Sequence, residues 1–118
     1  MASRPEELSE RTKHFAIRIV KLFRALPKTE EARVRLKQVL RSGTSVAANY
    51  RALCRSRSRA DFIAKLAVVT EEADETVFWL ELLAETGIVA KQQLEKLLME
   101  ANELIRIFGS SLHTARSR

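Results

Sequence analysis

Apolar residues recur every three or four positions along most of the chain, which is the spacing of one face of an α-helix. The first such run predicts a helix from about Pro5 to Leu26, with Ser3 as its N-terminal cap and Pro27 as its end. The apolar face of this predicted helix consists of Leu8, Phe15, Ile19, Leu22 and Leu26.

A second run predicts a helix from about Thr29 to Cys54, although the small and polar residues 42–45 (SGTS) interrupt it with poor helix formers. A loop at this point is one interpretation. We favour a continuous helix, because the apolar phase continues across the run and small side chains let a neighbouring helix approach closely. The apolar face consists of Leu36, Val39, Leu40, Gly43, Val46, Ala47, Tyr50 and Leu53.

Two further helices are predicted in the second half of the chain. Ser58 and Asp61 form a capping-box pattern before the third, and Gly87 is typical of the residue after a helix end. The fourth runs from about Ala90 to Phe108. The apolar face of the third consists of Phe62, Leu66, Val69, Ala73, Val77, Leu80 and Ala84. That of the fourth consists of Leu94, Leu97, Leu98, Ala101, Leu104, Ile105 and Phe108.

Four long helices with short connections are expected to pack as an all-α, up-and-down antiparallel four-helix bundle. The 118 residues include only three glycines and two prolines, which favours a single helical domain over residues 1–118. The first few residues and residues 110–118 are expected to fray.

Charge is distributed unevenly between the two halves. Residues 1–60 contain fifteen basic and five acidic residues and residues 61–118 contain six and ten, so the halves carry +10 and −4 and the chain +6. Such a surface suits an anionic partner, self-association, or both. The single cysteine, Cys54, and the lack of a signal peptide or a long apolar run predict a cytoplasmic protein with no membrane segment.

The third helix carries more apolar surface than one core face requires. Burial by the two flanking helices is one interpretation, and a seam for a partner subunit is the other. The residues of this predicted seam are Phe78, Trp79 and Leu82.

The sequence contains no catalytic constellation, so neither an enzyme nor a bound cofactor is expected. Carboxylates cluster in residues 71–85, but a metal site in a helical bundle needs Glu-x-x-His motifs, which are absent. His14 and His113 lack metal ligands at suitable spacing, and Cys54 has no histidine nearby in the sequence. We therefore interpret the carboxylates as a solvated or ion-paired face.

Arginine predominates over lysine around the end of the second helix. Arginine suits bidentate contacts to phosphate, which predicts a surface that binds RNA or DNA. The alternative is a solubilising face that is partly paired with the acidic third helix. Tyr50 has the ring needed to stack on a base, but its position in the apolar phase favours the core. The predicted nucleic-acid-binding residues are Arg51, Arg55, Arg57 and Arg59.

Three segments in order resemble the motifs of a known family. Residues 41–49 (RSGTSVAAN) resemble R-S-x-x-S-[IV]-x-x-N, residues 61–66 (DFIAKL) resemble [ED]-F-I-x-K-L, and residues 72–80 (EADETVFWL) resemble E-A-x-E-[TS]-x-x-W-L. The family is that of the 23S rRNA intervening-sequence proteins, which includes the accessory variability determinant of diversity-generating retroelements. The resemblance spans roughly residues 8–112.

This resemblance implies a four-helix bundle that assembles into a homopentamer, and one branch of the family associates with reverse transcriptase and nucleic acid. After Asn49, many members carry Glu or Glu-Gly, whereas residues 50–53 here read YRAL and add positive charge. The leading hypothesis is a non-enzymatic, basic homo-oligomer that binds nucleic acid or a nucleic-acid enzyme. The alternative is a protein-interaction scaffold whose arginines serve subunit contacts.

The family signature also has a physical interpretation. Asn49 on a buried or half-buried face requires hydrogen-bond partners, which we expect to be backbone groups or the carboxylates of Glu72 or Glu75. A structural polar network is therefore favoured over a ligand site. Its predicted members are Arg41, Ser45, Asn49, Glu72 and Glu75.

Overall fold

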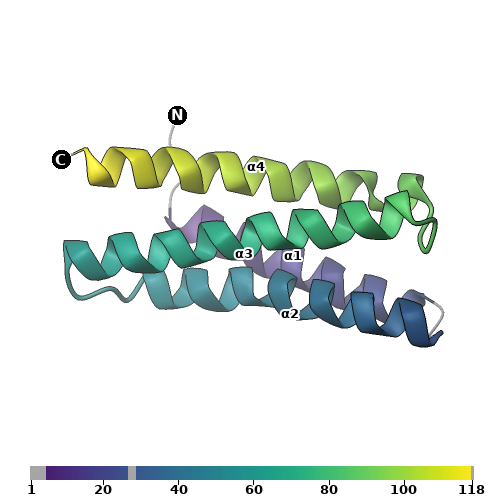
Figure 1. Cartoon of the computed structure of the whole chain (residues 1–118). Coiled ribbons are helices and arrows are strands. Elements are labelled where there is room, and N and C mark those ends of the chain that lie inside the picture. The colour runs from purple at the N-terminus through teal and green to yellow at the C-terminus, as the bar shows by residue number, and fades with distance from the viewer. Residues whose placement is uncertain (1–4, 27–28, 118) are drawn as a thin grey trace.

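The computed structural model describes residues 5–26 and 29–117, which form four helices. These are α1 (Pro5–Ala25), α2 (Glu30–Leu53), α3 (Arg59–Glu85) and α4 (Lys91–Arg116). Each helix runs antiparallel to the one before it, in an elongated bundle of 47 × 22 × 20 Å (Figure 1). Consecutive helices pack along their lengths, whereas α1 and α4 touch more sparsely. The predicted up-and-down four-helix bundle is confirmed.

The ends of the helices follow the local signals in the sequence. Thr29 caps α2 by accepting a hydrogen bond from the Ala32 amide at 3.3 Å, and Ser58 caps α3 by accepting one from the Asp61 amide at 3.0 Å. Gly87 follows α3 with a φ of 74°, a left-handed conformation that glycine adopts without steric cost. The predictions for Ser3 and Pro27 lie outside the described residues.

Helix α2 is continuous through residues 42–45, so the favoured interpretation is confirmed and the loop is wrong. Gly43 lies against Ile19 of α1 so closely that a Cβ atom there would come within 2.9 Å of Ile19 Cγ1. The hydroxyl groups of Ser42 and Thr44 donate to carbonyl oxygens one turn back in the helix, at 2.9 and 2.6 Å. Poor helix formers are tolerated here because their small side chains let α1 pack closely against α2.

The core is apolar and takes residues from all four helices. Ile19, Val46, Val69, Leu80 and Leu94 are each fully buried. Among the described residues, three buried side chains are polar, and the hydroxyl of each donates to a carbonyl of its own helix. The apolar pattern did not mark these residues, which are Thr12, Ser42 and Thr76.

Helix α4 extends to Arg116, which corrects the predicted end at Phe108. Leu112 packs against the core, and the carbonyl oxygen of Ala115 accepts a hydrogen bond from the Arg59 guanidinium group. These tertiary contacts hold turns that the composition alone assigned to a frayed tail. Of residues 110–118, only Arg118 lies outside the described part.

Because of the cap of α3, the stability of the protein depends on pH in the acidic range. Asp61 accepts hydrogen bonds from Lys65 Nζ at 2.9 Å and from the Arg57 amide at 3.3 Å, and both lower the pKa of its carboxyl group. A lowered pKa in the folded state contributes stability above the unfolded value of about 3.9, and this is lost as pH falls through the folded value. Asp61→Asn should therefore lower stability at neutral pH and flatten its decline below about pH 4.

Urea unfolding at a series of pH values between neutral and acidic measures this effect. Asp74→Asn is the matched control, because Asp74 is an exposed aspartate on the same helix but far from its cap. An Asp61→Asn profile that parallels the wild-type curve at every pH would contradict the assignment of this carboxylate to the cap.

Candidate nucleic-acid interface

The connection between α2 and α3 is a short, well-bonded turn. The amides of Cys54, Arg55 and Ser56 donate to the last carbonyls of α2 at 3.0–3.1 Å. The Ser56 hydroxyl donates to the Leu53 carbonyl at 2.6 Å, and Ser58 begins the cap of α3. The backbone groups of the turn are thus used internally, which leaves its long side chains to face the solvent.

Three of the four predicted arginines lie in or beside the α2–α3 turn at this end of the bundle, and we call them the arginine pole: Arg55, Arg57 and Arg59. All three are exposed. Asp61 is the nearest acidic residue in the sequence, and its carboxylate is engaged by Lys65 and a backbone amide. The turn therefore places three exposed arginines within five residues of the chain, and Asp61 lies close enough to Arg57 for their charges to interact.

Arg51 is also exposed and lies four residues before Arg55. It lines a groove between α1 and α2 together with Lys13 and small residues of α2. Spacing along one helix placed Arg51 and Arg55 on a common face. The sequence pattern carried no signal of this groove, and the place of Arg51 among the nucleic-acid-binding residues stays a prediction.

The C-terminal turns of α4 lie beside the arginine pole, at the end of the bundle that holds the α2–α3 turn (Figure 1). Arg59 donates a hydrogen bond to the carbonyl of Ala115, and the exposed Arg116 adds a further cation on the last turn. Sequence reasoning missed this contribution because it expected this segment to fray.

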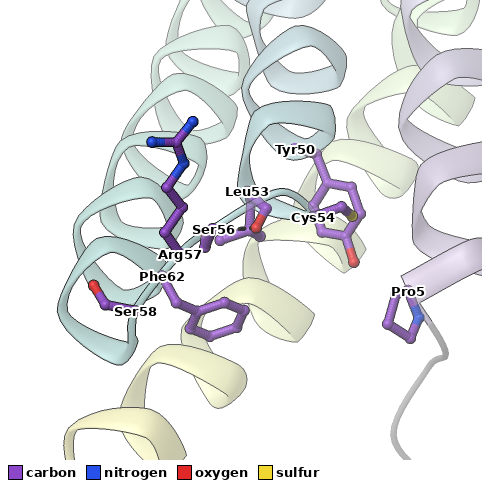
Figure 2. Close-up of a pocket in the computed structure, with 8 residues that line it drawn as sticks. All are labelled: Pro5, Tyr50, Leu53, Cys54, Ser56, Arg57, Ser58 and Phe62. Atoms are coloured by element: carbon purple, nitrogen blue, oxygen red, sulfur yellow. Dashed lines mark hydrogen bonds between the residues drawn. The ribbon is translucent and has the colours of Figure 1, made fainter.

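A pocket of about 440 Å³ lies behind the turn (Figure 2). Tyr50 and Cys54 lie on one side of it and Phe62 on another, while the Arg57 side chain extends away from Phe62. The Sγ atom of Cys54 lies 3.8 Å from the Ser9 hydroxyl oxygen. This arrangement shields apolar side chains behind the pole but supplies no acid–base pair.

Tyr50 belongs to the core, as its phase predicted. It is 5% exposed, and its ring stacks on Phe108 with centroids 5.8 Å apart. Burial is the main cause that raises the pKa of its hydroxyl group well above the ordinary tyrosine value. The ring is therefore a structural support beneath the pole, and base stacking is not available to it.

The five residues of the predicted polar network are only partly brought together. Arg41 donates to Glu72 Oε2 at 3.4 Å and also to Glu75, so a single guanidinium group of α2 holds two carboxylates of α3. The Arg41 pKa is raised chiefly by its hydrogen bond to Glu75. Within the described residues, no side-chain hydrogen bond joins Ser45 or Asn49 to this cluster, and both are half-buried. Their membership in the network stays a prediction.

A model of the family described as 23S rRNA-intervening sequence protein matches residues 6–110. The chain belongs to this family. The crystal structure of a protein of unknown function from Bacteroides thetaiotaomicron, of the S23 ribosomal protein family, is similar at 38% identity and a TM-score of 0.83. The similarity covers 92% of this chain and 97% of that chain. No curated protein matches the chain significantly.

The signature segment of this intervening-sequence protein has structural roles at four positions. Arg41 clamps α2 to α3 through Glu72 and Glu75, and Gly43 lets α1 approach α2. Ala47 and Ala48 keep the neighbouring groove open. Segments that resemble the family are therefore used in this chain to set the distances between its helices.

The two charged halves of this intervening-sequence protein are joined across the bundle. Arg11 of α1 makes two hydrogen bonds to Glu100 of α4, at 2.7 and 3.1 Å, where the two helices otherwise touch sparsely. The pKa of Arg11 is raised mainly by this bond. Some of the basic residues are thus paired with carboxylates inside the fold, whereas Arg55 and Arg57 of the arginine pole are exposed.

The predicted seam residues on α3 are arranged as an apolar patch. Phe78 is 54% exposed and contacts the half-buried Trp79 edge to face, with centroids 5.1 Å apart. Leu82 is half-buried one turn further along. Trp79 Nε1 is buried without a hydrogen-bond partner among the described residues. The patch is available for a further contact.

The described residues contain no cluster of three His, Cys, Asp or Glu side chains that is able to hold a metal ion. None of the described helices is both long and apolar enough to cross a lipid bilayer.

Proposed function

We propose that this intervening-sequence protein is a non-enzymatic, cytoplasmic homo-oligomer that binds nucleic acid through its arginine pole. The observation that carries the proposal is the turn at residues 54–58, whose backbone is bonded internally while its arginines, Arg55 and Arg57, stay exposed. Guanidinium groups form paired hydrogen bonds to phosphate, and a preformed turn loses little entropy when it binds. The resemblance implies a pentamer, which would present five such poles.

Repetition of the pole in an oligomer strengthens the proposal. Each pole offers a few phosphate contacts, which give weak and sequence-independent binding alone. Several poles on one particle bind one polyanion with a high effective concentration, so the assembly gains affinity without new contacts. The expected ligand is therefore a nucleic acid long enough to span more than one pole, and its sequence matters little. Association with a reverse-transcriptase-like protein, implied by the family resemblance, is a further prediction.

Removal of two pole charges tests the proposal. Arg55→Gln/Arg57→Gln should weaken binding of single-stranded RNA by tenfold or more at low salt, because each lost phosphate contact removes counterion release. For each pole in contact with the nucleic acid, the slope of log K against log salt should become shallower by about 1.4 for single strands or 1.8 for duplex, if each arginine contacts one phosphate. Fluorescence anisotropy with RNA, single-stranded DNA and duplex DNA at two salt concentrations measures both quantities.

The matched control removes the same charge at the other end of the bundle. Arg24 and Arg33 are exposed near the α1–α2 connection, so Arg24→Gln/Arg33→Gln should bind nearly as the wild type does. Equal losses in the two double variants would show a diffuse charge effect and would contradict a localised pole.

The second candidate is a protein-interaction scaffold without a nucleic-acid role. The observation that favours it is the way Arg11 and Arg41 already bind carboxylates across helices, since pole arginines would bind acidic residues of a neighbouring subunit in the same way. Arg55→Glu distinguishes the two candidates. It should dissociate the oligomer if the scaffold is correct, and weaken RNA binding at unchanged mass if the pole binds nucleic acid.

A further inference from the structure

One face of α3 carries acidic and apolar residues in a single row. Positions 71, 75, 78, 82 and 85 are three or four apart, so their side chains share one face of the helix. Phe78 is 54% exposed, and Glu71 and Glu85 are exposed as well. We call this face the α3 strip: Glu71, Glu75, Phe78, Leu82 and Glu85.

The strip has the composition of a contact surface rather than of a solvated face. Phe78 is exposed next to the half-buried Trp79 and Leu82, and contiguous apolar groups on a surface mark interaction sites. Glu75 already binds Arg41 of the same chain, whereas Glu71 and Glu85 have no ion pair among the described residues. A partner for this strip must therefore supply a shallow apolar surface and cations.

The surface that meets this requirement lies on α1 and α2 of the same molecule. We call it the α1–α2 groove, a depression of about 560 Å³. Thr44, Ala47 and Ala48 give it short side chains, so a large side chain from outside has room to enter. Lys13 and Arg51 supply cations at its sides, against the single carboxylate of Glu10.

We infer that the α3 strip of one copy docks in the α1–α2 groove of the next, with Phe78 against Ala47 and Ala48 and the strip carboxylates beside Lys13 and Arg51. This inference rests on the proposed homo-oligomer and names its contacting faces. A large aromatic side chain that fills a shallow pocket of small residues is a common arrangement at interface centres, and opposite charges at the rim set the orientation.

The positions of the strip and the groove bear on the symmetry of the oligomer. The strip lies on α3 and the groove between α1 and α2, and α1 does not pack against α3 within the chain. Where the strip and the groove of one copy engage two different neighbours, the contact is heterologous, and repetition of it by a closing rotation produces a ring. Each copy then uses both surfaces once, while the arginine pole remains at the end of the bundle.

Two variants that each damage one surface test this inference. Phe78→Glu places a charge in the strip, and Lys13→Glu/Ala48→Glu places bulk and negative charge in the groove. Light scattering after size exclusion should show that both fall to the monomer mass of 13.4 kDa, with helical circular dichroism retained. Met99→Glu is the control, because Met99 is a 71% exposed apolar residue on α4, and its mass should equal that of the wild type.

A mixture of the two variants tests the head-to-tail arrangement itself. One intact strip and one intact groove remain in each mixed pair, so the mixture should form a 1:1 dimer of twice the monomer mass. A mixture that stays monomeric overturns the heterologous contact. Variants that keep the wild-type mass overturn the choice of faces and leave the oligomer standing, whereas a monomeric wild type removes the oligomer as well.

Discussion

Replacement of Gly43 by valine should lower the free energy of unfolding by about 3 kcal/mol, which is the upper range for overpacking a core. A Cβ atom at this position already comes within 2.9 Å of Ile19 Cγ1 and 3.1 Å of Ile19 Cγ2, and valine adds two methyl groups. Ile19 is fully buried, so its side chain has no free space into which to retreat. Helix α1 must move away from α2, and the contacts that join them are lost.

The same replacement at Gly109 is the matched control. Gly109 also lies within a helix, but a Cβ atom there has no neighbour within 4 Å, so Gly109→Val should be close to neutral. Gly43→Val and Ile19→Ala form a double-mutant cycle. The double variant should lose less free energy of unfolding than the sum of the two single variants, because alanine removes both atoms that clash. If the losses in free energy of unfolding were additive, the strain in Gly43→Val would not come from contact with Ile19. Urea unfolding at one fixed protein concentration measures all variants, since an oligomer's stability depends on concentration.

The second large effect is expected at the core beneath the arginine pole. Phe108→Ala should lower the free energy of unfolding by about 4 kcal/mol, a typical cost of removing a buried aromatic ring. Phe108 is 1% exposed and stacks on Tyr50, so its loss leaves a cavity between α2 and α4. The C-terminal turns of α4 follow directly, and their hold on Arg59 should weaken with them.

Phe108→Leu separates the effect of volume from that of the ring. Leucine keeps most of the buried volume, so it should cost less than about 1.5 kcal/mol. Urea unfolding gives the two energies, and amide hydrogen exchange at residues 109–116 reports the C-terminal turns. Exchange that is unchanged in Phe108→Ala would mean that α4 is held at this end by other contacts.

These two effects bear on function because the core and the pole share elements. The stacked rings of Tyr50 and Phe108 pack the C-terminal end of α2 against α4. The turn that carries Arg55 and Arg57 begins immediately after α2. A rigid support holds the backbone of the turn in place, which reduces the ordering entropy that nucleic-acid binding costs. Loss of nucleic-acid binding in Phe108→Ala would therefore be a consequence of geometry rather than of charge.

The sequence alone determined the class of fold and most of the core. Helical periodicity, caps such as Ser58 and the glycine after α3 act within one or two turns of chain, so they can be interpreted without knowledge of the neighbours. Tyr50 was assigned to the core for the same reason. Even the continuity of α2 through Gly43 followed from the uninterrupted apolar phase.

Only the tertiary structure decided which residues meet across helices. The pairs Arg41 with Glu72 and Glu75, and Arg11 with Glu100, depend on the axial register and rotation of packed helices, which periodicity leaves open. The same freedom explains why Arg51 lines a groove with residues of α1, and why α4 continues to Arg116 once Ala115 contacts Arg59. Local patterns fix which face of a helix is buried, whereas only the packed bundle fixes what each remaining side chain contacts.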